Sequence, residues 1–142
     1  VAESQGKLVT VTRADLTAGY KSVQSTHAAI NFIFEHYGRA SPWFADSNTL
    51  VQLELKDEKQ LKLLIQKCEQ LQLCYTVFRE PDIGNQITAL AIEPSEVTRK
   101  LVSKIPLLFK NKTNNNVSST QNPVDEGKGI QQNKNSSLQE TD

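Results

Sequence analysis

Residues 7–36 read KLVTVTRADLTAGYKSVQSTHAAINFIFEH, and this stretch decides the fold class. Its first seven residues alternate in polarity and are rich in β-branched side chains, which predicts a strand over Lys7–Arg13. A turn at residues 15–19 follows, and a helical pattern then runs over residues 20–36. Five side chains recur at helical spacing and predict the buried face of this helix: Val23, His27, Ile30, Phe34 and Tyr37.

Three further strands are predicted downstream. Thr49–Leu55 alternates cleanly, and residues 73–79 and 87–92 are rich in β-branched and apolar side chains. The short connection at residues 80–86 is typical of a hairpin-like return between the last two strands. Residues 38–48, with Pro42 and several turn-forming side chains, are expected to form a loop.

Two further helices are predicted. Asp57 is expected to cap the first, with Gln60 completing a capping box. This helix carries a buried stripe at helical spacing: Leu61, Leu64, Ile65, Cys68 and Leu71. Ser95 is expected to cap a short helix that ends near Val102, and residues 105–109 are expected to add an edge strand or to pack in an extended form.

This order of elements predicts an α/β fold, a single three-layer domain with a four-stranded mixed β-sheet and helices on both faces. Helical crossovers make some strand pairs parallel, and the connection at residues 80–86 makes one pair antiparallel. The domain is expected to occupy residues 1–110. Residues 111–142 are mostly polar, with few large apolar side chains, so they are predicted to form a disordered tail.

Charge and composition exclude several classes of protein. The 16 basic and 16 acidic residues cancel, which argues against a protein that coats nucleic acid by bulk charge. A local basic patch remains open, and its candidates are four cations near the expected cleft: Arg13, Lys21, Arg39 and Arg79. No apolar run approaches the roughly 20 residues that span a bilayer. Cys68 and Cys74 lie in apolar patterns and are expected to be buried free thiols in a reducing cytoplasm.

The start of the first helix holds the most unusual residues. Lys21 lies in the first turn, where a cation opposes the helix dipole. It is either an exposed lysine or a cation placed for a phosphate or a developing oxyanion. Gly19 would let the backbone approach a ligand closely. His27 lies in the expected apolar stripe, so it is either a satisfied core histidine or a group that faces a cleft.

A second cluster follows the third strand. Acidic residues such as Asp82 are common in turns, but ligands of α/β sheets gather at the carboxyl ends of strands. If the first and third strands are parallel, Asp82 and the start of the first helix share one edge, where Thr88 could add a hydroxyl group. His27 and His36 are not accompanied by Cys or carboxylate at metal-ligand spacing, so neither a metal nor a cofactor is expected.

These stretches together resemble the class II peptidyl-tRNA hydrolases. The resemblance rests on residues 8–16 (LVTVTRADL), 24–29 (QSTHAA), 82–84 (DIG) and 88–94 (TALAIEP), which occur in the family's order. It implies a cytoplasmic enzyme that hydrolyses the ester between a peptide and the 3′ end of tRNA, without a cofactor. It also implies peptidyl-tRNA as the partner and a possible homodimer.

The resemblance implies roles for eight residues. Lys21 would stabilise negative charge or hold a phosphate, Asp82 would orient or deprotonate water, and His27 would help to shape the site. Substrate-binding roles are implied for a second group: Arg13, Gly19, Tyr20, Gln24 and Thr88. The turn before the helix is about two residues shorter than the family's Gly-Lys-Gly-Lys turn. The alternative is therefore a non-catalytic family member that binds RNA or a protein.

Overall fold

The computed structural model describes residues 6–110. The predicted disordered tail at residues 111–142 lies outside the described residues, so that prediction and the domain boundary stay untested. The described part holds four strands, four α-helices and one short 3-10 turn: β1 (Lys7–Arg13), α1 (Ala18–Glu35), α2 (Tyr37–Ala45), β2 (Thr49–Leu55), α3 (Glu58–Gln70), β3 (Tyr75–Glu80), the turn Pro81–Ile83, β4 (Gln86–Ile92) and α4 (Glu96–Leu101).

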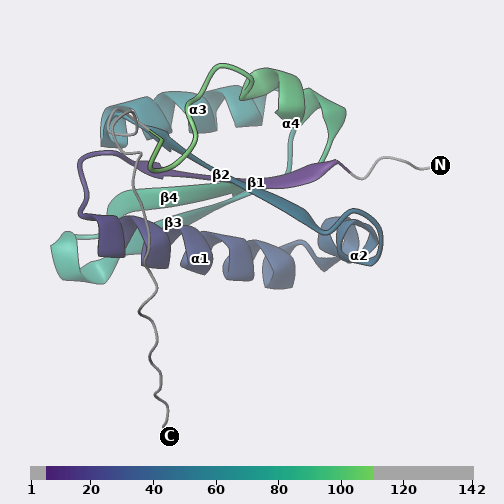
Figure 1. Ribbon diagram of the computed structural model, residues 1–142, viewed down its shortest axis with the longest axis horizontal. Helices are drawn as coiled ribbons and strands as arrows, with labels where there is room; N and C mark the ends of the chain where they lie inside the picture. Colours follow the sequence, from purple (N-terminus) through teal and green to yellow (C-terminus); the bar gives the residue numbers. More distant parts are fainter. Residues whose placement is uncertain (1–5, 111–142) are drawn as a thin grey trace, which may run out of the picture. The chain divides into compact units, whose positions relative to one another are not determined.

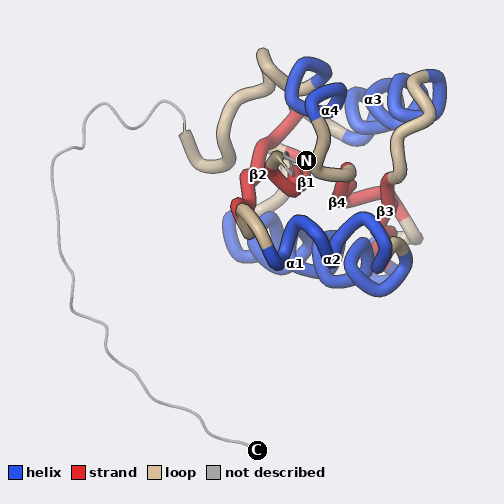
Figure 2. Tube along the Cα trace, turned by 90° about the vertical axis from the view of Figure 1, so that its right-hand side faces the viewer, coloured by secondary structure: helices blue, strands red, loops and turns tan. Residues whose placement is uncertain are grey.

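The four strands form one mixed sheet in the order β2-β1-β4-β3. β1 pairs in parallel with β2, and β4 pairs antiparallel with both β1 and β3. Figures 1 and 2 show α1 and α2 on one face of the sheet and α3 and α4 on the other. The predicted three-layer α/β fold is therefore confirmed. It follows that β1, β2 and β3 all run in one direction and end at the same edge.

Alternation along the strands divides the core into two clusters. Val9 and Val11 of β1 pack with the buried face of α3, where Leu61, Leu64 and Cys68 are buried. The Asp57 side chain accepts a hydrogen bond from the Gln60 N–H at 3.1 Å, which confirms the predicted cap. The second cluster, under α1 and α2, is made of smaller side chains together with three large ones: Leu8, Ala28, Phe32, Ala40, Trp43, Ala89 and Ala91.

The predicted buried face of α1 is wrong. Its buried residues are Gln24, Ser25, Ala28 and Phe32, roughly 150° around the helix from the predicted stripe at 100° per residue. The stripe itself is exposed, with Phe34 81 % accessible. The reason lies in the sheet, whose surface under α1 is lined by small and polar side chains that admit a close helix but no large apolar face: Thr10, Thr12, Thr88, Ala89 and Ala91.

The loop predicted at residues 38–48 is also wrong, because most of it forms α2. Pro42 lies inside this helix, where it lacks the N–H that an interior position normally donates. Burial of Trp43 offsets that loss: its side chain is 6 % exposed, and its indole N–H donates to the Thr49 carbonyl oxygen at 2.8 Å. Tertiary packing therefore overrides the local turn signal.

The last described residues run beside β2. Leu107 forms a single antiparallel bridge with Leu53, which corresponds to the extended packing predicted there.

Cys68 is fully buried, and burial raises the pKa of its thiol to about 12, while Cys74 is half-buried. None of the helices within residues 6–110 combines the length and the apolar character that crossing a membrane requires.

Candidate functional site

The carboxyl edge of the sheet brings the predicted site residues to one end of the molecule. Arg13 ends β1, and α1 begins five residues later, where the Thr17 hydroxyl caps it by accepting from the Tyr20 N–H at 3.4 Å. The turn that carries Asp82 follows β3 at this same edge. β1 and β3 run parallel, because each is antiparallel to β4. This is the condition under which Asp82 and the start of α1 were expected to share one edge.

A β-bulge points Thr88 at α1. Phe78 of β3 lies opposite Ala89, but the next residue, Arg79, lies opposite Ile87, so Thr88 has no partner in the ladder. An extra residue in one strand breaks the alternation, and bulges often re-aim a side chain beside an active site. Here Thr88 and Ala89 both face α1, whereas Ile87 stays in the core under α3.

A chain of hydrogen bonds runs from this bulge to the Asp82 turn. The Thr88 hydroxyl donates to Gln24 Oε1 at 2.5 Å, and Gln24 Nε2 donates to Glu80 Oε1 at 2.9 Å. The other carboxylate oxygen of Glu80 accepts from the Asp82 N–H at 3.1 Å. That backbone bond, the Gln24 bond and the charge of nearby His27 hold the pKa of Glu80 below its usual range. We call these four residues, Thr88, Gln24, Glu80 and Asp82, the relay.

The turn that carries Asp82 is held at both ends. The Glu80 carbonyl oxygen accepts from the Asn85 N–H at 2.9 Å, which closes the turn. Gly84 ends it with φ of 72°, a left-handed conformation that favours glycine. The Asp82 side chain is exposed. A carboxylate therefore projects into solvent from a backbone that is fixed on both sides.

One of the two interpretations that the sequence left open for His27 is wrong. His27 is exposed, so the interpretation as a core histidine is wrong. Its ring stacks on Phe78 of β3, with centroids 4.5 Å apart and an angle of 7° between the planes. It also lies close enough to Glu80 to lower the pKa of that carboxyl. His27 therefore lines the side of the relay that faces β3.

Lys21 lies on the other side of the helix, over β2. Its Nζ is 2.9 Å from Glu54 Oε1, and both side chains are mostly buried, at 13 % and 16 % exposed. Nζ also lies 5.5 Å from the centre of the Phe109 ring. β2 and β3 are the two outer strands, with backbones roughly 14 Å apart at about 4.8 Å per strand. Within residues 6–110 no hydrogen bond or ion pair joins Lys21, His27 and Asp82 to one another.

Arg13 is buried and fully engaged. Its Nε and Nη2 donate to the two oxygens of Asp15 at 2.9 and 3.0 Å, and its Nη1 donates to Gln86 Oε1 at 2.8 Å and to the Ile87 carbonyl oxygen at 3.1 Å. The bidentate pair holds the pKa of Asp15 below its usual range. Arg13 therefore ties the end of β1 to the start of β4.

The remaining predicted residues differ in their surroundings. Gly19 is exposed in the first turn of α1, where an added Cβ would meet nothing within 4 Å, and Tyr20 is half-buried. Arg79 is exposed and donates to the Asn85 carbonyl oxygen at 3.2 Å. Arg39 pairs with Glu93, which follows the carboxyl end of β4, so Arg39 lies at the end of the sheet away from the relay and its place near the cleft was predicted wrongly.

Sequence reasoning missed two carboxylates. Glu80 precedes the Pro81-Asp82 turn and was treated only as part of that turn, although it is the residue that contacts both Gln24 and Asp82. Glu54 lies in the alternating pattern of β2, and nothing in that pattern distinguishes it from a solvent-facing strand residue. The signal for Glu54 was the topology, since a parallel β1–β2 pair brings it to the same edge as Lys21.

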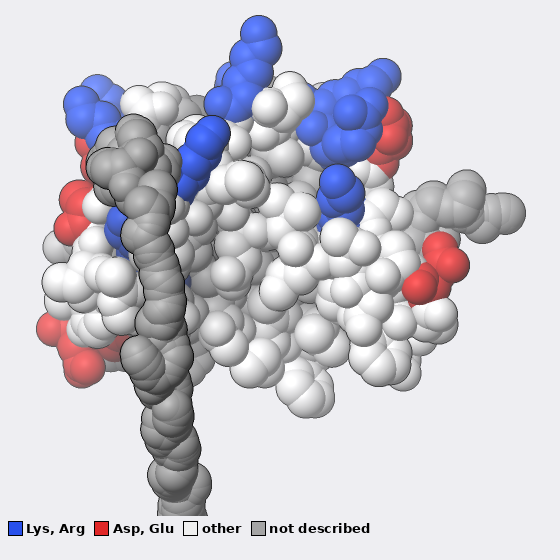
Figure 3. All heavy atoms as spheres, viewed as in Figure 1, with Lys and Arg blue, Asp and Glu red and all other residues white. Residues whose placement is uncertain are grey.

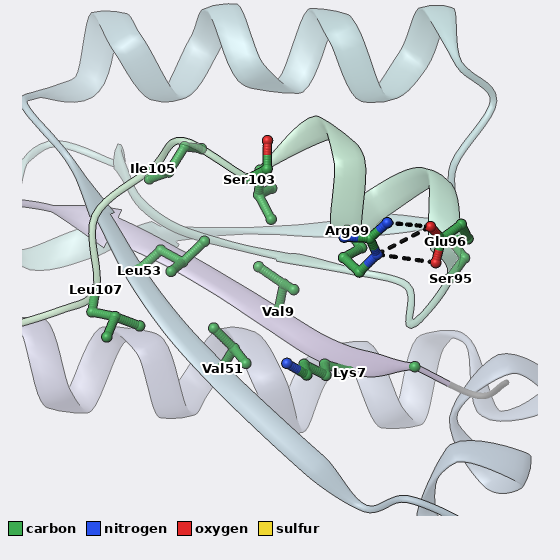
Figure 4. Close-up of a pocket in the computed structure, with 12 residues that line it drawn as sticks. Lys7, Val9, Val51, Leu53, Ser95, Glu96, Arg99, Ser103, Ile105 and Leu107 are labelled. Atoms are coloured by element: carbon green, nitrogen blue, oxygen red, sulfur yellow. Dashed lines mark hydrogen bonds and ion pairs between the residues drawn. The ribbon is translucent and has the colours of Figure 1, made fainter.

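The described residues also form a cavity away from the relay. It measures about 440 Å³ and opens between α4, the last described segment and the strands β1 and β2. Figure 4 shows its apolar wall of Val9, Val51 and Leu53, and Arg99 tied to Glu96 at its rim. None of the predicted site residues lines this cavity. The cavity and the polar side chains of the relay therefore indicate two different places for a site. We take the relay as the candidate site, because its groups carry the charge and hydrogen bonding that a reaction needs. No group of three His, Cys, Asp or Glu side chains suited to a metal ion occurs in residues 6–110.

Comparisons with known proteins agree with this architecture. The sequence matches the family described as peptidyl-tRNA hydrolase PTH2 over residues 6–108. Among solved structures, the chain is similar to a protein of unknown function from Agrobacterium tumefaciens strain C58, with a TM-score of 0.55 and 11 % identity over 74 % of this chain and 98 % of that one. This likeness concerns the fold. No curated protein matches the chain.

Proposed function

Because the chain belongs to the peptidyl-tRNA hydrolase PTH2 family, we propose that it hydrolyses the ester that joins a peptide to the 3′ end of tRNA. One observation supports the relay as the site: an exposed carboxylate, Asp82, is linked through Glu80 and buried Gln24 to helix α1. The buried members of the relay, Gln24 and Thr88, would be costly to leave unpaired, and both are hydrogen-bonded here. The protein would act on peptidyl-tRNA in the cytoplasm.

In this proposal Asp82 is the general base. It orients a water molecule and accepts its proton as the water oxygen attacks the ester carbonyl carbon. The carbonyl oxygen takes up negative charge. Lys21 lies over β2, paired with Glu54, so in this proposal it would hold a phosphate of the tRNA rather than this oxygen. When the bond between the carbonyl carbon and the 3′ oxygen breaks, the proton passes from Asp82 to that oxygen. The products are a peptide with a free carboxyl group and a free tRNA, and the scheme needs no cofactor.

The other predicted residues fall into two groups by exposure. Arg13, Gln24 and Thr88 are buried and engaged, so we assign them to holding the site rather than to direct contact with substrate. Gly19 and Tyr20 lie in the first turn of α1, where the Gly19 N–H is available to a phosphate while the Tyr20 N–H donates to Thr17. His27 offers an exposed ring, backed by Phe78, on which an unpaired base at the tRNA end would stack.

A second copy of the chain is the protein partner that we propose. α1 has no Asp, Glu, Lys or Arg between Lys21 and Glu35, and large apolar side chains cover the exposed face of α1 and α2: Val23, Ile30, Phe34, Tyr37 and Phe44. Figure 3 agrees, because Lys and Arg gather over α3 and α4 while the face over α1 is largely uncharged. We call these five residues the uncharged face. A twofold dimer would bury it without burying charge.

Release of free tRNA from purified peptidyl-tRNA tests the hydrolase function. The wild-type chain is expected to release tRNA, and a double variant Asp82→Ala with Lys21→Ala is expected to release none above background. Asp46→Ala with Lys100→Ala is the matched control, because both side chains are exposed and lie outside the relay. Equal release by wild type and the Asp82 and Lys21 variant would contradict the proposed site. Binding of tRNA without any release would instead indicate the non-catalytic alternative.

A further inference from the structure

We propose that Glu80 is a positioning residue, which fixes Asp82 against helix α1 through two hydrogen bonds; the inference rests on the hydrolase function proposed above. Glu80 is the only residue of the relay that touches both the helix and the turn. Each of its two carboxylate oxygens makes one of these bonds, since Oε1 accepts from Gln24 and Oε2 accepts from the Asp82 N–H.

The direction of every bond in the relay is set by Glu80. An ionised carboxylate accepts hydrogen bonds and donates none, so the Gln24 amide must turn its NH₂ group toward Glu80. The amide oxygen then faces Thr88, whose hydroxyl donates to it. Gln24 is 1 % exposed, so no water competes for either end of its amide. Glu80 therefore orients a buried side chain as well as the turn.

The sequence of the turn makes Asp82 the residue that Glu80 can hold. Pro81 has no N–H, so the first backbone donor after Glu80 is that of Asp82. The Glu80 carboxylate accepts this donor and caps the 3-10 turn at its start. Asp82 is thus fixed by its backbone, and its own carboxylate stays available in solvent.

Gln24 connects Glu80 to the helix that carries the other two candidate catalytic residues. It lies three residues after Lys21 and three before His27, so the three side chains fall within two turns of one helix. A bond from Gln24 to Glu80 therefore sets the distance from Asp82 to Lys21 and to His27. Misplacement of about 1 Å at a reacting group can lower a rate roughly 100-fold, which makes such a bond significant.

The decisive variant is Glu80→Gln, because it replaces one of the two carboxylate oxygens with an NH₂ group, which cannot accept from Gln24 or from the Asp82 N–H. We expect kcat to fall roughly 10- to 100-fold with KM nearly unchanged. The matched control is Glu35→Gln. Glu35 also links α1 to β3, by accepting from the Thr76 hydroxyl at 2.8 Å, but it lies at the other end of α1. Glu35→Gln removes the same charge but keeps an oxygen that accepts from Thr76, so its kcat should stay near that of the wild type.

A double variant, Gln24→Glu with Glu80→Gln, separates position from charge. In it the carboxylate introduced at position 24 accepts from Thr88 and from the amide introduced at position 80. The oxygen of that amide accepts the Asp82 N–H, so all three bonds are restored while the charge moves to the helix. Positioning predicts that kcat returns to within roughly tenfold of wild type. A double variant that folds yet stays as slow as Glu80→Gln would mean that the Glu80 charge acts directly, and the proposal would be wrong.

Hydrogen exchange of the Asp82 backbone amide provides a readout that does not depend on activity. We expect a protected amide in the wild type and in Glu35→Gln, and exchange at least roughly tenfold faster in Glu80→Gln, as loss of a protecting hydrogen bond implies. If the wild type releases no tRNA but this pattern holds, the hydrolase function fails while the positioning of Asp82 stands. If Asp82 exchanges equally fast in all variants, or if Glu80→Gln and Glu35→Gln have equal kcat, the inference is overturned.

Discussion

Gln24 of α1 and Thr88 of β4 share a hydrogen bond where neither side chain reaches water, at 1 % and 0 % exposed. The bond exists because the bulge in β4 turns Thr88 toward the helix. Buried polar groups stabilise a fold only when they are paired, and one left without its partner costs its full desolvation. This pair therefore joins the stability of the domain to the geometry of its candidate site.

Thr88→Val should destabilise the domain. It removes the hydroxyl that Gln24 Oε1 accepts from, and leaves that oxygen buried, which costs about 1–3 kcal/mol. Thr10→Val is the matched control, because the buried Thr10 hydroxyl has no partner among the described residues. The control should be neutral or more stable than wild type. Urea unfolding measures both, and equal losses would contradict this account.

Substitutions of Lys21 and of Glu54 should change the affinity for tRNA in opposite directions. Glu54→Gln removes the partner of Lys21 at 2.9 Å and leaves its charge uncompensated, so affinity for tRNA should rise at low salt. Lys21→Ala should weaken binding and lower the slope of log affinity against log salt by about one. Filter binding over a salt series measures this. Lys100→Ala on α4 is the control, and an equal effect there would place the tRNA elsewhere.

The pair of Arg13 and Asp15 should make stability depend on acid pH. Because Arg13 holds the pKa of folded Asp15 below the unfolded value of about 3.9, the pair stabilises the fold above that pH. The contribution is lost as pH falls through the lower, folded value. The stability difference between wild type and Asp15→Asn should therefore be constant near neutral pH and shrink below about pH 4. Urea titrations from roughly pH 2.5 to about pH 7, at equal ionic strength, measure it, and a constant difference would exclude the pair as its cause.

The uncharged face should mediate self-association. Phe34→Glu places a charge on a residue that is 81 % exposed in the single chain, so it should disrupt a dimer without unfolding the domain. Light scattering after size-exclusion chromatography measures the mass. Leu71→Glu is the control, because Leu71 is 49 % exposed at the end of α3 on the other layer. A wild type that is monomeric at high concentration would exclude this partner.

Alternation of apolar and polar residues was enough to predict the strands and the three-layer order. Lys7–Arg13 and Thr49–Leu55 were predicted with their observed bounds, because a strand shows its faces in its own sequence. The face of α1 could not be predicted in this way. Helical periodicity identifies the more apolar side, but Ser25 and Ala28 are buried because the sheet beneath them is lined by small side chains.

The candidate site was predictable only in part. Parallel β1 and β3 brought Asp82 and α1 to one edge, as their order implied. The bulge at Thr88 depends on how two strands pair, and a one-residue offset between strands leaves no mark in either strand alone. Glu80 resembled an ordinary turn residue, and its role appeared only when Gln24 was found on the buried side of α1.

The bulge also leaves Thr88 outside the register that pairs β3 with β4. Ile87 and Ala89 already lie opposite successive residues of β3 and point to opposite faces, as neighbours in an uninterrupted strand would. Thr88 therefore has no partner in the β3–β4 ladder, although its carbonyl oxygen accepts from the Thr12 hydroxyl of β1 at 2.7 Å. Deleting this one residue would leave each apolar side chain of β4 on its present face and remove the relay's first hydroxyl. The bulge thus presents a polar group to the helix while the hydrophobic pattern of the strand is kept.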